Sequence, residues 1–398
     1  MRKFLLLIAA AFLFGVVSCE KDPLGNEETN EERSALDLYW DADYSGKLGI
    51  QVAGGNTPYM TLAGEPLYIT GINCYNLFNQ SVNPTMSVAD MEETVRVLVE
   101  QKVPVVRFNC NIYHKNELES YYFGKKQQYF ANLTRLAQLC DEAHILLIPS
   151  VFWQIATLPD YYSEPLEAWG DKGSDTYKFM LNYTAEVVNL LKDHKCIAAW
   201  EFGNEFNLAA DIDIAGYPNI TATQIGTAMK GFADVVASLD PQGRLISSGH
   251  SVMRNAQWHL FNSNNWTVDS FSQYVEMTGV MTPSPIRGMS EHIYEDSRSF
   301  SDRGTLDRAD QIASSMECAK SLGKVFYVGE FTGPSDASAD VVKSHYDTYF
   351  EQGVQLSLIW NYALRGNVEH SFKAGTREGN IAFGYMRDLN KRFSDATK

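Results

Sequence analysis

The chain of 398 residues contains few cysteines, and their spacing is not that of a metal site. Neither a Cys-x-x-Cys pair nor a zinc-type pattern occurs among the six cysteines and eight histidines, so we expect no metal ion and no cofactor. Cys140, Cys196 and Cys318 lie in apolar segments and are predicted to be core thiols. Cys74 and Cys110 both stand at the ends of predicted strands, which leaves open a disulfide between them or two free thiols.

Positive charge is also scarce. The chain has 33 Lys and Arg against 49 Asp and Glu, a formal net charge of -16. This balance disfavours nucleic acids and anionic lipids as partners, and it permits a neutral ligand without identifying one. Gly and Pro are ordinary in number, so neither a disordered nor a fibrous class is indicated. The hydrophobic content of 45% and the length suffice for one large domain.

The N-terminal apolar run, residues 4–17, is too short for a membrane-spanning helix. It follows two basic residues, as in a signal peptide. Val16-Val17-Ser18-Cys19 resembles a bacterial lipobox, which would be cleaved before Cys19 and lipidated at its sulfur. An ordinary secretory signal is the alternative.

The chain is accordingly divided into three parts. Residues 1–18 are predicted to be a signal peptide, residues 19–35 a lipidated acidic tether, and residues 36–398 a folded domain. The expected location is the bacterial outer membrane, on its periplasmic or cell-surface side. Contact with the membrane is expected only through the lipid.

Eight short apolar segments alternate with amphipathic helical patterns. They recur roughly every 30 to 50 residues, which suits β/α units with long loops. We predict an α/β fold, a closed (β/α)8 barrel whose bottom is closed by a short β-meander in residues 36–67. An open doubly wound sheet is the alternative, but no glycine-rich phosphate loop follows any strand. The predicted strands are 68–74, 104–110, 145–152, 197–202, 244–248, 288–293, 325–330 and 354–360, and the predicted helices are 87–101, 128–143, 175–192, 223–239, 268–277, 306–322 and 340–352.

Polar and aromatic residues gather at the C-terminal ends of these strands, where such a barrel carries its active site. Two of them, Glu205 and Glu330, end apolar strands, and a pair of carboxyl groups is what retaining hydrolysis of a glycosidic bond requires. Glu201 has the strand parity of Glu205 but lies deeper. We predict it to be a buried structural carboxylate with a basic or hydroxyl partner, Arg107 being the candidate. The residues at these ends are Asn73, Tyr75, Arg107, Asn109, Phe152, Trp153, Asn204, Glu205, His250, His292, Tyr294, Glu330 and Trp360.

The segment Trp200-Glu-Phe-Gly-Asn-Glu205 resembles the strand-four acid/base motif of glycoside hydrolase clan GH-A. Val328-Gly-Glu-Phe331 resembles its strand-seven nucleophile motif, and His292-Ile-Tyr294 resembles the strand-six His-x-Tyr of family 5, the cellulase and mannanase family. Arg107 and Trp360 match that family's strand-two Arg and strand-eight Trp.

The resemblance covers about residues 36–398 and departs at one position. Many family members carry His at the end of strand three, where this chain has Ser150-Val-Phe-Trp153. Mannanase-like members often have an aromatic residue there, so the departure favours that side.

The resemblance implies a retaining β-glycoside hydrolase acting on a polysaccharide such as β-mannan or β-1,4-glucan. Glu205 would be the acid/base and Glu330 the nucleophile, with their carboxyl groups about 5 Å apart. The supporting residues would be Arg107 and Tyr294 beside Glu330, His292 beside Glu205 or the substrate, Asn204 at the substrate 2-hydroxyl, Trp360 as the floor and Trp153 as a wall.

Two other functions remain open: a glycan-binding barrel lipoprotein that has lost catalysis, and a transglycosidase. Polysaccharides or oligosaccharides are the expected partners, together with other surface proteins of glycan utilisation. Trp169, Trp258 and Trp266 are predicted to lie in loops and to stack on more distant sugars. His250 is predicted to be a core histidine or to support the site from behind.

Overall fold

The computed structural model describes residues 33–396, apart from 112–113, 213–218 and 367. The predicted signal peptide, Cys19 and the tether up to residue 32 therefore lie outside the described residues. Within the described part of the chain, no helix combines the length and the apolar character needed to cross a membrane.

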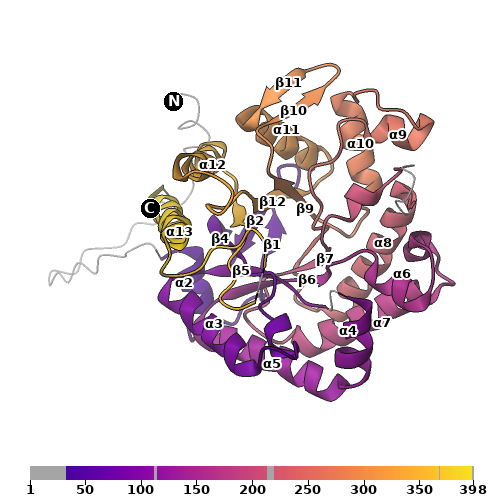
Figure 1. The fold of residues 1–398 in the computed structure, drawn as a ribbon. Coiled ribbons are helices and arrows are strands. Elements are labelled where there is room, and N and C mark those ends of the chain that lie inside the picture. The colour runs from indigo at the N-terminus through magenta and orange to yellow at the C-terminus, as the bar shows by residue number, and fades with distance from the viewer. Residues whose placement is uncertain (1–32, 112–113, 213–218, 367, 397–398) are drawn as a thin grey trace, which may run out of the picture. The chain divides into compact units, whose positions relative to one another are not determined.

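Eight parallel strands close into a barrel, which confirms the predicted fold (Figure 1). Going round the barrel, the order follows the sequence, and β13 pairs with β4 to close the ring. All eight predicted strand positions are confirmed to within a few residues. The barrel strands are β4 (Ile69–Asn73), β5 (Val105–Asn109), β6 (Leu146–Phe152), β7 (Ala199–Gly203), β8 (Leu245–Ser247), β9 (Gly288–Ile293), β12 (Val325–Phe331) and β13 (Leu356–Ile359).

Helices surround the barrel and bury one face each against it (Figure 1). Seven of them were predicted; the eighth long helix, α13, was not. The capping box at the start of α3 is present, with Ser87 and Asp90 satisfying each other's backbone N–H groups. The long helices are α3 (Val88–Glu100), α5 (Lys126–Ala143), α7 (Asp175–Leu191), α8 (Ala222–Leu239), α10 (Phe271–Met281), α11 (Arg308–Ser321), α12 (Ala339–Gln352) and α13 (Arg377–Ala396).

The N-terminal part of the domain closes one end of the barrel. A short helix, α2 (Ala35–Trp40), precedes an antiparallel sheet of β1 (Gln51–Ala53), β2 (Tyr59–Leu62) and β3 (Glu65–Pro66). The predicted meander is thus present, with a helix before it that was not predicted. Ile50 is buried, and its N–H donates to the carbonyl of Ala198, just before β7, while its carbonyl accepts from the N–H of Leu245 in β8.

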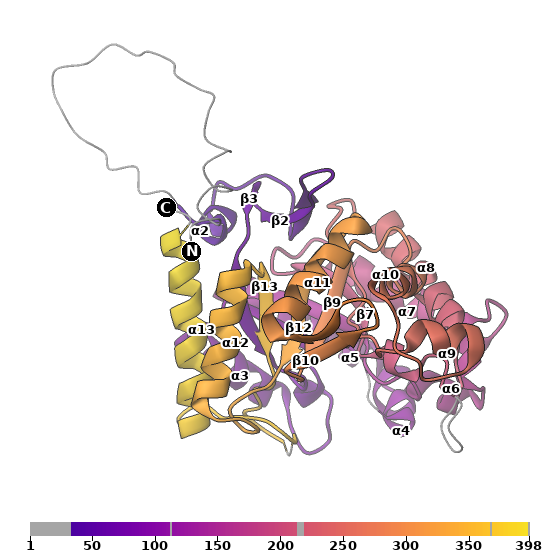
Figure 2. The ribbon, with the colours of Figure 1, turned by 90° about the horizontal axis from the view of Figure 1, so that it is seen from above.

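The opposite end carries the loops that follow the strands. Figure 2 shows β2 and β3 at one end of the domain, and α4 (Lys115–Glu117) and α6 (Thr157–Tyr162) at the other. A hairpin of β10 (Ser297–Phe300) and β11 (Gly304–Asp307), which was not predicted, follows β9.

The five cysteines in the described residues are all buried and free. The disulfide between Cys74 and Cys110 that the sequence left open therefore does not form. Burial raises the pKa of both thiols well above its ordinary value, so both stay protonated and unreactive.

Candidate active site

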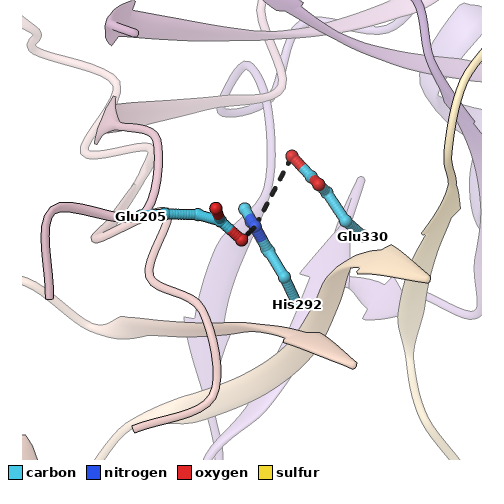
Figure 3. Close-up of side chains that lie close together, drawn as sticks. All are labelled: Glu205, His292 and Glu330. Atoms are coloured by element: carbon cyan, nitrogen blue, oxygen red, sulfur yellow. Dashed lines mark hydrogen bonds and ion pairs between the residues drawn. The ribbon is translucent and has the colours of Figure 1, made fainter. Parts of the chain in front are cut away.

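The ends of β7 and β12 bring Glu205 and Glu330 to the same place in the barrel mouth. One carboxylate oxygen of each, together with one imidazole nitrogen of His292, lies within 4.8 Å of the others. In Figure 3 the two carboxyl groups lie on either side of the His292 ring. Glu205 lies two residues beyond the end of β7 and has the left-handed backbone conformation, with φ of 57°, which is strained for a residue with a side chain.

A β-bulge at Gly329 turns Glu330 into the barrel. Val328 pairs with Glu291 and Glu330 with His292, so two steps along β12 match one step along β9. Phe331, the next residue, packs outward on the aromatic rings of α12. The bulge also brings Gly329 close to its neighbours, since a Cβ there would lie 2.4 Å from the Ser290 hydroxyl.

The guanidinium of Arg107 lies beneath the two glutamates and is fully buried. Its Nη1 donates to Glu330 Oε1 at 2.7 Å and to Asn73 Oδ1 at 3.0 Å. Its Nη2 donates to Asn204 Oδ1 at 2.9 Å. The Asn204 oxygen is therefore occupied, which leaves its amide nitrogen as the group that can donate to a ligand.

Tyr294 binds the other oxygen of Glu330. Its hydroxyl donates to Oε2 at 2.5 Å, although the residue as a whole is 41% exposed. Burial and the charge of Glu330 raise the pKa of Tyr294 far above its ordinary value, so the hydroxyl remains a donor. Both oxygens of Glu330 thus accept a hydrogen bond, which favours the carboxylate form and opposes the effect of burial on its pKa.

His292 lies between the two glutamates. Its Nδ1 is 2.9 Å from Glu205 Oε1 and 3.5 Å from Glu330 Oε1. Its Nε2 is buried and has no hydrogen-bond partner among the described residues. A proton on Nδ1 can therefore be donated in a hydrogen bond to Glu205.

The two carboxyl groups have opposite pKa shifts. Burial by itself raises the pKa of Glu205, but the hydrogen bond and charge of His292, with the Ser251 hydroxyl, outweigh it, so this pKa lies below its usual range. Complete burial raises the pKa of Glu330, against the charges of His292 and Arg107. Glu205 is the more accessible of the two, its side chain being 27% exposed against 5% for Glu330.

Two tryptophans form an aromatic wall beside the carboxylates. The Trp153 and Trp360 rings stack with their centroids 6.1 Å apart and an interplanar angle of 28°. The guanidinium of Arg107 lies 4.6 Å from the centre of the Trp153 ring. Flat apolar faces next to hydrogen-bonding groups suit a sugar ring.

Glu201 has the structural position that its strand parity predicted. It is fully buried and accepts a hydrogen bond from Arg107 Nε at 2.7 Å. Its second oxygen accepts one from the Tyr327 hydroxyl, also at 2.7 Å. Tyr327 was not predicted from the sequence. The signal that could have identified it is its phenol, a polar group inside the otherwise apolar strand that carries Glu330.

The cluster of Glu205, His292 and Glu330 has the composition and spacing of a divalent cation site. Its hydrogen bonds argue against that use. Arg107, a permanent cation, already binds one oxygen of Glu330, and Tyr294 donates to the other. A metal ion would have to displace both, and we assign none.

The predictions for residues farther from the two carboxylates have mixed outcomes. Trp169 is not a sugar platform: it is fully buried, donates to the Ile155 carbonyl and packs on Phe206, because the loop after β6 folds back over the helices. Trp258 is partly buried and hydrogen-bonded to Glu276, whereas Trp266 is 61% exposed. His250 is a core histidine as predicted, and burial lowers its pKa to about 4.

Comparisons with known proteins agree with the barrel. No model of a known protein family matches the chain, and no curated protein matches it. Solved structures do. The chain is similar to an endo-1,4-β-mannanase from Rhizomucor miehei (TM-score 0.63, 15% identity, 86% of this chain and 99% of that one). It is also similar to a glycoside hydrolase family 5 mannosidase from the same organism (TM-score 0.64, 13% identity, 87% and 99%). A third similar structure is the catalytic domain of an endoglucanase from Thermobifida fusca (TM-score 0.53, 14% identity, 86% and 97%). At these identities the similarity establishes the (β/α)8 fold over most of the chain.

Proposed function

We propose that the protein is a retaining β-glycoside hydrolase of clan GH-A, in family 5, that acts on a β-linked polysaccharide. The observation that carries the proposal is the placement of Glu205 and Glu330, which offer carboxylate oxygens within 4.8 Å of each other across a barrel mouth. Retaining glycosidases hold their two carboxyl groups about 5 to 5.5 Å apart, whereas inverting enzymes need about 6.5 to 9.5 Å to admit a water molecule.

In the first step, Glu330 attacks the anomeric carbon and forms a glycosyl ester as the bond to the leaving oxygen breaks. Glu205 donates its proton to that oxygen. The roles follow from the surroundings. Glu330 is buried and receives donors at both oxygens, while Glu205 is partly exposed and can exchange protons with water.

Glu205 must be protonated when the substrate is bound. In the empty site the hydrogen bond from His292 lowers the pKa of Glu205 against the effect of burial, and the partly exposed Glu205 carboxyl group can take up a proton from water. A bound sugar excludes water from this pair. Loss of water favours the neutral form of the Glu205 carboxyl group, so its pKa rises and it is protonated when the sugar is bound.

In the second step, Glu205 accepts a proton from water as that water attacks the anomeric carbon. The ester to Glu330 breaks, and Glu330 leaves as a carboxylate, held by Arg107 and Tyr294. The Asn204 amide nitrogen is the donor we assign to the substrate 2-hydroxyl, and Trp360 with Trp153 forms the platform for the sugar.

The substrate class that we propose is β-mannan or β-1,4-glucan. Trp153 stands where many family members carry His, and the similar solved structures include a mannanase, a mannosidase and an endoglucanase. We also propose anchoring through a lipid on Cys19; radiolabelled palmitate should then be incorporated by the wild-type chain and not by Cys19→Ala.

The test is incubation of the purified protein with β-mannan, β-1,4-glucan and xylan, followed by sizing of the products. Proton NMR of the first-formed products should show the β anomer, as retention requires. Glu330→Gln should abolish the release of products. A protein that binds one of these polysaccharides but releases nothing from any of them would be the inactive glycan-binding barrel. Products longer than the substrate at high acceptor concentration would indicate a transglycosidase.

A further inference from the structure

One buried cation serves two buried carboxylates beneath the site. Arg107 donates through Nε to Glu201 and through Nη1 to Glu330, both at 2.7 Å. All three side chains are at most 5% exposed. Two negative charges therefore share one positive charge where water does not screen them, and the charge of Glu201 reduces what Arg107 provides to Glu330.

Tyr327 is hydrogen-bonded to Glu201, through the carboxylate oxygen that Arg107 does not use. Its hydroxyl donates to Glu201 Oε2 at 2.7 Å and lies 2.7 Å from the Ser247 hydroxyl. Burial raises the pKa of Tyr327 well above its ordinary value, so the phenol keeps its proton. Because Tyr327 uses its proton on Glu201, Ser247 is the donor in the second contact.

We propose that Tyr327 and Glu201 are positioning residues that together set how strongly Arg107 stabilises the charge of Glu330. The proposal rests on the proposed function of Glu330. Glu201 holds the Nε edge of the guanidinium, which aims Nη1 at Glu330. The Tyr327 hydroxyl carries part of the charge of Glu201, which would otherwise be balanced by Arg107 alone.

The two residues should act on Glu330 with opposite signs. Glu201→Gln keeps the shape and an acceptor for Nε but removes a negative charge, so Arg107 acts on Glu330 alone and the pKa of Glu330 should fall. Tyr327→Phe removes the donor on Glu201, so Glu201 draws more on Arg107 and the pKa of Glu330 should rise. We expect shifts of about one unit, the low end of what a charged neighbour produces.

Other charged and titratable groups also face Glu330, and both variants leave them unchanged. They are Arg107 from β5, His292 and Tyr294 from β9 and the loop after it, and Glu205 from the end of β7. A difference between the two variants therefore reports on the Tyr327–Glu201 pair.

The experiment is a 13C NMR titration of the full chain labelled at the glutamate side-chain carboxyl carbon. The Glu330 signal is assigned by its loss in Glu330→Gln. The matched control is Tyr274→Phe, since Tyr274 is likewise buried and donates to a buried carboxylate, Glu291, at 2.7 Å. This control should leave the pKa of Glu330 unchanged.

The acidic limb of kcat/KM on the active polysaccharide provides a second readout and should shift in the same directions. If the pKa of Glu330 shifts in the same direction in Glu201→Gln and Tyr327→Phe, or does not shift in either, the proposal that these residues act on Glu330 through Arg107 is wrong. The NMR titration gives this answer even if the wild-type chain hydrolyses nothing, whereas lack of hydrolysis by itself contradicts only the proposed function.

Discussion

Tyr327 and Glu330 lie three residues apart on one strand, and both point into the barrel. Strict alternation along a strand would place them on opposite faces. The register shift at Gly329 absorbs one residue, so Tyr327 reaches Glu201 and Glu330 reaches Arg107. The same strand therefore supplies both Glu330 and Tyr327, the residue that donates a hydrogen bond to Glu201.

This bulge leads to the first prediction, which concerns Gly329→Ala. The added Cβ would lie 2.4 Å from Ser290 Oγ and 2.9 Å from the His292 ring, so the bulge must shift. Misplacing a reacting group by about 1 Å costs on the order of 100-fold in rate, and we expect a loss of kcat of that size with folding retained. Gly384→Ala is the control, because nothing lies within 4 Å of the added Cβ. Equal kcat in both variants would show that the bulge geometry is not critical.

The second prediction concerns the pH dependence of Glu205. His292→Phe removes the donor that lowers the pKa of Glu205, after which burial dominates and the pKa rises. The general acid then stays protonated to higher pH, so the alkaline limb of kcat/KM should move to higher pH, although the maximum falls. The pH profile of initial rates measures this shift.

His345→Phe provides the matched comparison for His292. His345 is buried outside the barrel against Tyr349, and burial lowers its pKa to about 3, so it is neutral at any working pH. His345→Phe should leave the alkaline limb of the kcat/KM profile at the same pH as in the wild type. A limb that moves to lower pH in His292→Phe would contradict the assignment of Glu205 as the acid.

The third prediction concerns stability. The pKa of Glu330 is raised in the folded protein, chiefly by burial, so the folded state favours the protonated form. That contribution is fully present below the unfolded pKa and is lost as pH rises through the folded pKa. Glu330→Gln should therefore have a higher Tm than the wild type near pH 7, with the difference shrinking toward pH 4.

Glu317→Gln should behave in the opposite way. The hydrogen bond from Arg303 lowers the pKa of Glu317, so its charged form supports folding above the unfolded pKa. Because Glu317 is exposed, the loss in Tm should be small and should appear only at the higher pH. Thermal denaturation at a series of pH values measures both variants.

The fourth prediction separates near from distant aromatic contacts. Trp360 stacks with Trp153 beside the carboxylates, so Trp360→Ala should raise KM for substrates of any length. Trp266 is 61% exposed and, among the described residues, takes part in none of the contacts of the site, so Trp266→Ala should raise KM only for long chains. Kinetics on oligosaccharides of increasing length will distinguish the two. An unchanged KM for long chains would remove Trp266 from the binding surface.

The sequence by itself determined the barrel and the places of its strands, because hydrophobic runs and helical periodicity reflect local burial. It also predicted that Glu201 is buried with Arg107 as its partner, since parity along β7 is a local property. Helix α13 was missed although the sequence carries its signal, since the buried residues Phe383, Met386 and Leu389 recur at helical spacing along a polar segment.

Only the tertiary structure decided how the site is connected. The inward turn of Glu330 depends on a register shift between β12 and β9, two strands that meet only in the closed sheet. Trp169 lies in the core and not in the barrel mouth because of how its loop packs, which periodicity does not encode. The link from Tyr327 through Glu201 and Arg107 joins three strands far apart along the chain, so it exists only once the ring has closed.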